Sequence, residues 1–383
     1  MSVETLSTKN EFEQKLSYET ERKFLPIFPE DFAELREAAR PIEQFYLSHP
    51  DEPFSLRMRE TLNDSGDLVY EATLKDDGTL TMEGITRIEV TTPITPEMYV
   101  MYRDDTVPLL RKLRAEPVPG VVVDFYDDGT MQVESESPVN WPLFTDQHGD
   151  RLVDITTHPS SRNEWKAHLN FRRGHNGKEA LAIKPEVTAS DILEDIMEHF
   201  GHGPITVHLG GRSGSGKTTI VRELSDRLTR IGITTAVMST DDYHRGTRWL
   251  THYNNGQPWQ RWDEPIVYDT ETMAADITML RAGQQIARRS IDWITVEPTY
   301  SEPITPADVL IIEGIYANAT EITYPGDLTY ELTTPLATCV GRRLLRDMLE
   351  RPQFADPAAS LFYMLEQAEP AYRQQLLHRG IPQ

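Results

Sequence analysis

The sequence predicts two domains of different fold class, an N-terminal antiparallel β domain and a C-terminal parallel α/β domain. With 383 residues the chain is long enough for two separate cores. From Ser17 to about Pro138, short runs of alternating apolar residues are separated by turn signals such as NDSGD and KDDGT, which is typical of antiparallel strands closed into a barrel or sandwich. From Thr188 onward, helix-period and short apolar segments alternate, which indicates a parallel sheet with helices.

The N-terminal strands are expected where apolar and polar residues alternate. One segment, PEDFAELREAARP (29–41), interrupts them and is expected to be helical. The expected strands include SLRMRE (55–60), LVYEATLK (68–75), TRIEVT (86–91), GVVVDFY (120–126) and TMQVESES (130–137).

The C-terminal domain is expected to begin with a capped helix and a buried strand. TASDILEDIMEHF (188–200) has a Thr or Ser N-cap and helical apolar spacing, and PITVHLG (204–210) is a short apolar strand. The preceding segment is basic, contains Gly and ends near a Pro, which favours a domain boundary. We therefore expect domains at 1–175 and 191–383 joined by a linker at 176–190.

Composition narrows the classes of function. The sequence has 38 basic and 61 acidic residues, a formal net charge of -23. Because so acidic a surface repels other polyanions, we expect small-molecule partners and neither nucleic acid nor membrane. The single cysteine, Cys339, excludes an intrachain disulfide framework, and no apolar run approaches the ~20 residues of a membrane helix. We expect a cytoplasmic protein and leave open whether it forms a homo-oligomer.

The C-terminal half contains a phosphate-binding motif. GGRSGSGKT (210–218) follows an apolar strand and precedes a helical pattern, as a P-loop requires. Glycines let backbone N–H groups surround phosphate oxygens, Lys217 reaches the terminal phosphates with a catalytic role, and the Thr218 hydroxyl meets Mg²⁺. The alternative is a Gly-rich turn with a chance lysine. The residues expected to bind ATP are Gly211, Arg212, Ser213, Gly214, Ser215, Gly216, Lys217, Thr218 and Thr219.

Carboxylates end two further apolar runs. Asp241 and Asp242 follow TTAVMST, and Glu313 ends VLII. Because ligands bind at the carboxyl ends of parallel strands, these acids are expected to face the nucleotide. Each acid alone could equally be an exposed turn residue or a helix cap, but their joint position favours catalysis.

Five segments then follow one another in the order seen in the uridine kinase group of P-loop phosphotransferases. They are GGRSGSGKTT, STDDYHRG, RWDEPIVYD, DVLIIEGIY and GRRLLRDMLER, between about residues 203 and 375. The C-terminal half therefore resembles a uridine kinase. The resemblance implies ATP as the phosphoryl donor and a small-molecule hydroxyl as the acceptor, with uridine as the default.

The resemblance also implies roles for single residues. Asp241 would be the catalytic base on the acceptor hydroxyl, and Glu313 would hold Mg²⁺. Tyr243 and Asp263 would bind the acceptor. Three lid arginines would gather the charge of the transferred phosphoryl group, although their helical spacing also fits a solvated helix face: Arg342, Arg346 and Arg351. IDWITVEPTYSEP (291–303) has neither the His nor the Arg with which uridine kinases read the pyrimidine.

Charged residues alternate along the N-terminal strands, beginning with Glu19, Glu21 and Lys23. The alternation continues with Arg57, Arg59, Lys75, Arg87, Glu89, Lys112, Arg114, Asp124, Glu134 and Glu136. One interpretation is an ordinary antiparallel sheet with a solvated face. The acids lie on the first and last strands and the bases on the middle ones, however. Closing such a sheet into a barrel would make a tunnel with carboxylates on one wall and cations on another, suited to a divalent metal and a triphosphate chain.

This ordered set resembles the CYTH, or triphosphate tunnel metalloenzyme, family over roughly residues 17–170. The resemblance implies an eight-stranded tunnel that hydrolyses a triphosphate with Mg²⁺ or Mn²⁺, and a catalytic role for Lys23. Many members place another acid where this chain has Thr91. The implied metal ligands are Glu19, Glu21, Glu134 and Glu136. The implied phosphate-binding residues are Lys23, Arg57, Arg59, Lys75, Arg87, Lys112 and Arg114.

The two halves together predict a bifunctional phosphate enzyme, with a triphosphate hydrolase ahead of a P-loop kinase. The alternative is a regulatory or sensing protein, in which one module only binds nucleotide or polyphosphate and controls the other. The sequence identifies neither the triphosphate nor the acceptor.

Overall fold

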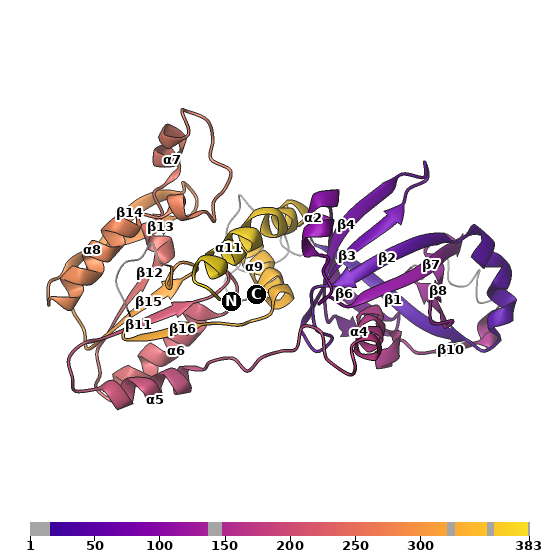
Figure 1. The fold of residues 1–383 in the computed structure, drawn as a ribbon, viewed down its shortest axis with the longest axis horizontal. Helices are drawn as coiled ribbons and strands as arrows, with labels where there is room; N and C mark the ends of the chain where they lie inside the picture. Colours follow the sequence, from indigo (N-terminus) through magenta and orange to yellow (C-terminus); the bar gives the residue numbers. More distant parts are fainter. Residues whose placement is uncertain (1–15, 137–147, 320–325, 351–355, 382–383) are drawn as a thin grey trace. The chain divides into compact units, whose positions relative to one another are not determined.

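The computed structural model describes residues 16–136, 148–319, 326–350 and 356–381. Contacts divide the chain into two units, and each is described by itself (Figure 1). The predicted limits of the domains and the linker stay a prediction. Unit 1 comprises Met1–Ile183, Leu336–Leu344 and Ala355–Phe362, and unit 2 comprises Lys184–Pro335, Leu345–Phe354 and Tyr363–Gln383.

Unit 1 is a closed barrel of eight antiparallel strands. The strands pair in the order β1-β9-β8-β7-β2-β3-β4-β6, and β6 pairs back with β1, which closes the sheet. The predicted antiparallel barrel and its eight strands are therefore confirmed. Short strands β5 (Thr79–Leu80) and β10 (Leu152–Asp154) extend the sheet beside β6 and β1. The eight strands are β1 (Ser17–Pro26), β2 (Arg40–Tyr46), β3 (Phe54–Leu62), β4 (Leu68–Asp76), β6 (Ile85–Pro93), β7 (Leu109–Val118), β8 (Val121–Tyr126) and β9 (Met131–Ser135).

The alternation of side chains gives the barrel an apolar outer layer on one side and a polar lumen. Val121, Val123 and Phe125 of β8 pack with Phe32 in an apolar cluster. Phe32 belongs to η1 (Pro29–Ala38), so the predicted helix is present, but as a 3₁₀ helix, with the Asp31 amide bonded to the Phe28 carbonyl. Because η1 covers this face, all six residues of β8 are buried instead of every second one.

Helix α4 (Asn163–Gly174) lies against β7 and β2. Its Ala167 packs with Tyr46 and Tyr126, while Asn163 and Glu164 in its first turn line the lumen. The remaining short helices of the N-terminal half are α2 (Pro96–Tyr102), η2 (Gly149–Arg151) and η3 (Pro159–Ser161).

Unit 2 is built on a four-stranded parallel sheet in the order β12-β15-β11-β16, which confirms the predicted α/β class. Both faces of the sheet are covered, so β11 and β15 are buried along their whole length. The predicted Thr188 cap of α5 forms a capping box with Asp191. The strands are β11 (Ile205–Gly210), β12 (Thr235–Ser239), β15 (Val309–Gly314) and β16 (Leu328–Glu331).

Separate apolar clusters lie on the two faces of this sheet. One joins it to α5 (Ala189–His199) and α6 (Lys217–Arg230), and the other to α8 (Thr270–Arg281) and a β13–β14 hairpin (Figure 1). The hairpin occupies the stretch that the sequence left without secondary structure. The hairpin strands are β13 (Ile286–Asp292) and β14 (Glu297–Ile304). The other helical segments of the C-terminal half are η4 (Thr240–Tyr243), α7 (Thr247–Tyr253), η5 (Pro265–Val267), α9 (Leu336–Glu350), α10 (Pro357–Tyr363), the π-helical η7 (Met364–Ala368) and α11 (Glu369–His378). Of these, α9 up to Leu344 and α10 up to Phe362 belong to unit 1.

Within the described ranges, none of the helices has the length and apolar character that crossing a bilayer requires.

Candidate functional site

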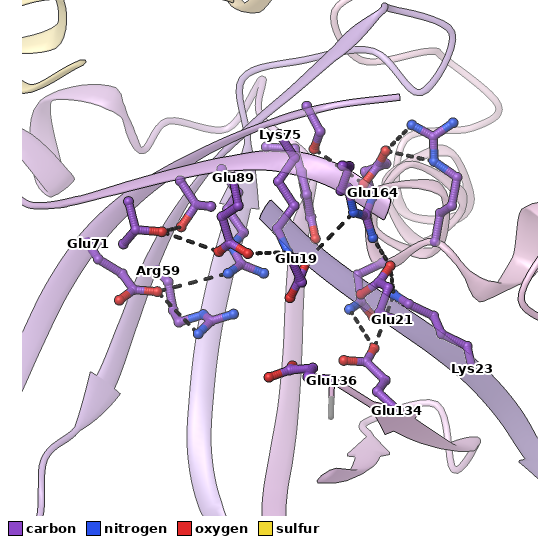
Figure 2. A pocket seen from close by; sticks show the side chains of 18 of the residues that line it. Glu19, Glu21, Lys23, Arg59, Glu71, Lys75, Glu89, Glu134, Glu136 and Glu164 are labelled. Atoms are coloured by element: carbon purple, nitrogen blue, oxygen red, sulfur yellow. Dashed lines mark hydrogen bonds and ion pairs between the residues drawn. The ribbon is translucent and has the colours of Figure 1, made fainter. Parts of the chain in front are cut away.

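The barrel encloses a cavity of about 290 Å³ whose wall is dominated by charge (Figure 2). Seven lining residues are carboxylates and seven are cations, so their formal charges cancel. All the predicted tunnel residues except Lys112 lie on this wall. The carboxylates are Glu19, Glu21, Glu71, Glu89, Glu134, Glu136 and Glu164. The cations are Lys23, Arg57, Arg59, Lys75, Arg87, Arg114 and Arg162.

The carboxylates of β1 are held by cations of β1, β4 and β6. Glu19 lies directly opposite Arg87 in the strand register, and it bonds the Lys75 ammonium and lies 3.6 Å from the Arg87 guanidinium. Glu21 pairs with Arg87 and, at 3.4 Å, with Lys23. Burial raises the pKa of Glu19, but Lys75 and Arg87 outweigh it and lower the pKa to about 2. Glu19 is therefore a carboxylate whose charge is already neutralised.

Glu134 on β9 is held in the same way. Its two carboxylate oxygens lie 3.2 Å from the Lys23 Nζ and 2.7 Å from an Arg114 Nη. Burial raises its pKa, and the stronger effects of Lys23 and Arg114 lower it well below the usual range. Glu136 is held more loosely, 3.6 Å from Arg114, and burial raises its pKa.

Lys112 differs from the other predicted phosphate ligands. Its side chain is fully buried and its Nζ lies 2.5 Å from the carboxylate of Asp124, which is also fully buried. It is not among the residues that line the cavity. Its expected phosphate contact stays a prediction. In this structure it donates a hydrogen bond to Asp124, and burial and then Arg114 lower its pKa to about 7.

Arg57, Arg59 and Arg87 each carry a buried Nε–H that has no hydrogen-bond partner in the described part of the chain. Arg59 contacts Glu71 at 3.1 Å, and Arg57 approaches the same carboxylate at 3.9 Å. Because buried donors are normally satisfied, these free N–H groups suit an anion with several oxygens.

Sequence reasoning missed several lining residues. Glu89 is one of the alternating charges recognised in the sequence, which assigns it no role. Glu71 lies four residues before Lys75 on the same strand, so the alternation could have identified it as well. Arg162 and Glu164 come from the segment that begins α4, where no strand period exists. Glu164 accepts hydrogen bonds from Arg162, and burial of its carboxylate raises the pKa, which Arg162 and Arg87 lower.

Carboxylates are the donor type that Mg²⁺ and Mn²⁺ prefer. Among the described residues, however, no group of three or more His, Cys, Asp or Glu side chains is arranged to hold a metal ion. Figure 2 shows Glu19, Glu21 and Glu134 joined to cations rather than converging on one point. The donor chemistry fits a divalent metal, and the arrangement of the donors does not.

In unit 2 the glycine-rich motif forms the turn between β11 and α6. Gly216 has φ of 96°, which an L-residue rarely adopts, and Lys217 begins α6. The Lys217 Nζ donates to the carbonyls of Gly211 and Arg212, both at 2.8 Å. Thr218 and Thr219 are exposed in the first turn of α6. This is the local geometry of a phosphate-binding loop at a helix N-terminus.

The predicted acids lie at the carboxyl ends of β12 and β15. Glu313 is opposite Ser239 in the strand register, and Asp241 and Asp242 follow in η4. Burial raises the pKa of Glu313, Lys217 lowers it, and Asp241 raises it further. Burial and then Asp241 raise the pKa of Asp242 to about 6. A Cβ on Gly314, where φ is 144°, would clash with Thr240, so glycine lets η4 approach β15.

The two predicted acceptor ligands have different surroundings. Asp263 lines a cavity of about 600 Å³, and its carboxylate accepts a hydrogen bond from the Tyr363 hydroxyl at 2.5 Å. Tyr243 is buried in the apolar cluster of α8, and its hydroxyl donates to Asp276 at 2.7 Å.

Two of the expected lid arginines, Arg342 and Arg346, lie on α9. The Arg346 guanidinium is 3.4 Å from the Ser213 hydroxyl of the glycine-rich loop and 2.9 Å from Asp347. Arg342 is exposed. Arg351 lies outside the described residues. Arg212, on the loop, pairs with Glu369 at 2.8 Å.

A glycine-rich loop between a parallel strand and a helix, with acids at the neighbouring strand ends, defines unit 2 as a P-loop nucleoside-triphosphate-binding fold. Comparison with known proteins narrows this fold class to one family. Residues 206–369 match the model of the phosphoribulokinase / uridine kinase family. Uridine kinase of Ureaplasma parvum serovar 3 is 30% identical over 150 residues, which are 39% of this chain and 71% of that protein. The chain therefore belongs to the uridine kinase family through its C-terminal half.

A second uridine kinase agrees with this assignment. Uridine kinase of Leuconostoc citreum is 29% identical over 164 residues, 39% of this chain and 72% of that protein. Solved structures were compared as well. A putative fructose transport system kinase from Silicibacter sp. TM1040 is 22% identical, with a TM-score of 0.43, and the match covers 49% of this chain and 95% of that protein. The inorganic triphosphatase NE1496 is 21% identical, with a TM-score of 0.24. The match covers 39% of this chain and 93% of that protein. Both scores are low, and the family assignment rests on the sequence matches.

Proposed function

We propose that the chain is a bifunctional phosphate enzyme. The barrel hydrolyses a triphosphate, inorganic or organic, as a triphosphate tunnel enzyme of the CYTH type. The C-terminal half transfers a phosphoryl group from ATP to a small-molecule hydroxyl, with a nucleoside such as uridine as the default acceptor. The observation that carries the proposal for the barrel is a cavity inside it with seven cations and seven carboxylates on its wall.

In the tunnel, the cations would bind the oxygens of the phosphate chain. Arg57, Arg59 and Arg87 have free N–H groups for this purpose. A carboxylate that accepts the proton of the attacking water must not be fully neutralised. Glu136 suits this role best, because burial raises its pKa and its nearest cation is 3.6 Å away. Lys23, between Glu21 and Glu134, would stabilise the charge that develops on the phosphoryl oxygens.

In the kinase half, Lys217 and the loop amides would hold the ATP phosphates. Asp241 would take the proton of the acceptor, Glu313 and Thr218 would hold Mg²⁺, and Asp263 would bind the acceptor beside Tyr363. Phosphoryl transfer depends mainly on positioning and charge stabilisation, which a cationic loop and nearby acids supply.

Two assays on the full chain test the proposal. The first measures phosphate release from inorganic triphosphate, nucleoside triphosphates and thiamine triphosphate with Mg²⁺ or Mn²⁺. The second measures transfer from labelled ATP to uridine, cytidine and other small alcohols. Glu19→Ala with Glu21→Ala should remove only the first activity, and Lys217→Ala only the second. Ligand-induced melting shifts without turnover in either assay would instead favour the regulatory or sensing alternative.

A further inference from the structure

Every ion pair of the predicted metal carboxylates in the lumen is made with a predicted phosphate-binding cation. The contacts between β1, β4 and β6 join Glu19 and Glu21 to Lys75 and Arg87. Those between β1, β7 and β9 join Glu134 to Lys23 and Arg114. We call Glu19, Glu21 and Glu134 the paired carboxylates, and Lys23, Lys75, Arg87 and Arg114 the pairing cations.

This pairing leaves a lumen that favours neither ligand alone. With seven acids and seven bases on the wall, a bare polyphosphate would bring uncompensated negative charge into a buried site. A bare divalent ion would bring uncompensated positive charge and would compete with ammonium and guanidinium groups for the same oxygens. Both costs are highest at the most buried side chains of the wall, Glu21, Lys23 and Glu134.

A metal and a polyphosphate that bind together avoid both costs. The phosphate oxygens replace the carboxylates as partners of the pairing cations, and the released carboxylate oxygens become available to the metal. The absence of a three-acid group in the described part of the barrel agrees with this exchange, because in the present arrangement the carboxylates face cations instead of one another.

We infer that the tunnel has no preformed divalent-metal site and that a bound phosphate chain creates it by drawing the pairing cations away from the paired carboxylates. Metal affinity and polyphosphate affinity are therefore positively coupled, and by linkage each ligand strengthens the other by the same factor. This inference rests on the proposed triphosphate-binding function of the barrel, and it adds that the two ligands are bound as a unit.

The decisive test measures Mn²⁺ binding without any phosphate, by the loss of the free-ion signal in electron paramagnetic resonance. Lys217→Ala is present throughout, so that the P-loop contributes little. Arg87→Met removes a cation from Glu19 and Glu21, and it should bind Mn²⁺ at least about 10-fold more tightly than the parent. Arg59→Met is the matched control, because Arg59 also lines the lumen but, within the described part of the chain, pairs with Glu71 and with none of the paired carboxylates. It should change Mn²⁺ affinity by less than about 3-fold.

The possible outcomes distinguish an exchange of ion partners from an effect of the net charge of the lumen alone. Equal gains in the Arg87 and Arg59 variants would show that net charge alone matters and would overturn the inference. No gain in either variant would also overturn it. If Arg87→Met does not fold, as judged by its thermal melting, Lys75→Met frees Glu19 in the same way and takes its place.

A second measurement tests the coupling in the parent protein. Imidotriphosphate, which resists hydrolysis, is titrated with and without Mn²⁺, with allowance for the complex that the two form in solution. Its affinity should rise about 10-fold or more when Mn²⁺ is present. Equal affinities with and without Mn²⁺ would overturn the coupling while leaving the triphosphate function in place. No binding of imidotriphosphate under either condition would instead count against the proposed function of the barrel.

Discussion

Asp124 accepts two hydrogen bonds from the guanidinium of Arg114, both at 2.7 Å, while its own side chain is fully buried. The same Arg114 reaches Glu134 at 2.7 Å on the lumen wall. Burial raises the pKa of Asp124, and the larger combined effect of Arg114 and Lys112 lowers it. Asp124 therefore orients a cation of the predicted phosphate site without lining the cavity itself.

Asp124→Ala should destabilise the barrel strongly. It leaves the fully buried Lys112 without its partner, and breaking a buried pair in this way typically costs about 3–5 kcal/mol in the free energy of unfolding. Urea denaturation followed by tryptophan fluorescence measures the loss. The double variant Lys112→Met with Asp124→Leu should recover part of it, because the buried Lys112 amine is removed together with its partner while Arg114 keeps its contact with Glu134. Equal losses in the single and double variants would contradict this account.

Glu19→Ala combined with Glu21→Ala should separate binding from turnover in the tunnel. Triphosphate hydrolysis should fall by at least about 10²-fold, the usual scale for removing groups that assist proton transfer. Triphosphate binding without metal should strengthen by roughly 10-fold or more, because Lys75 and Arg87 lose their carboxylate partners. Phosphate release and calorimetry measure the two effects.

The control for this variant is Glu30→Ala with Glu34→Ala, which changes two exposed carboxylates of η1. It should leave hydrolysis and binding unchanged. Hydrolysis at the wild-type rate in the Glu19 and Glu21 variant would show that the tunnel assignment is wrong.

Asp241→Asn should slow phosphoryl transfer by roughly 10²-fold or more and leave ATP affinity almost unchanged. The amide keeps the shape of the side chain but cannot accept the proton of the acceptor hydroxyl. Transfer from labelled ATP to the best acceptor, together with an ATP titration, measures the two quantities. Asp226→Asn, on the exposed face of α6, is the control. Near-normal transfer by Asp241→Asn would move the role of base to Asp242 or Asp263.

Lys217→Ala should instead weaken the ATP complex itself, by about 10-fold or more, because it deletes a cation beside the phosphates. Its Nζ also bonds two loop carbonyls at 2.8 Å, so the loop loses an internal support as well. The exposed Lys184→Ala is the control, and both variants should retain tunnel hydrolysis. Unchanged ATP affinity in Lys217→Ala would remove the P-loop from the proposed site.

The stability of unit 2 should depend on the protonation of Asp242. Its folded pKa of about 6 lies above the ordinary value of 3.8, so the folded state disfavours its charged form. The destabilisation is fully present above pH 6 and disappears as the pH falls through the folded and then the unfolded pKa. Asp242→Asn should therefore melt at a higher temperature than wild type at pH 8, and the difference should shrink steadily toward pH 4. A difference that is constant across this range would contradict the raised pKa.

The sequence predicted the P-loop well because its chemistry is local. Gly211 to Thr218 are contiguous, and a glycine-rich turn before a helix is specified by its own residues. The barrel class was also predictable, because the strand period assigns successive side chains to opposite faces. The β13–β14 hairpin and strand β2 were not identified, since neither shows a clean alternation of apolar and polar residues.

What the sequence by itself determined was which residue types alternate along each strand, and that the lumen would be charged. Only the tertiary structure decided which charged side chains form ion pairs with one another. The strand period assigns Lys112 and Arg114 to one face, but it does not say how far along the barrel each side chain reaches, and β8 places Asp124 against both. Likewise, Asp263 accepts a hydrogen bond from Tyr363, which lies 100 residues away in the sequence. Glu164 lines the lumen from a helix and not from a strand. These contacts depend on strand register and packing between distant segments, which no local pattern encodes.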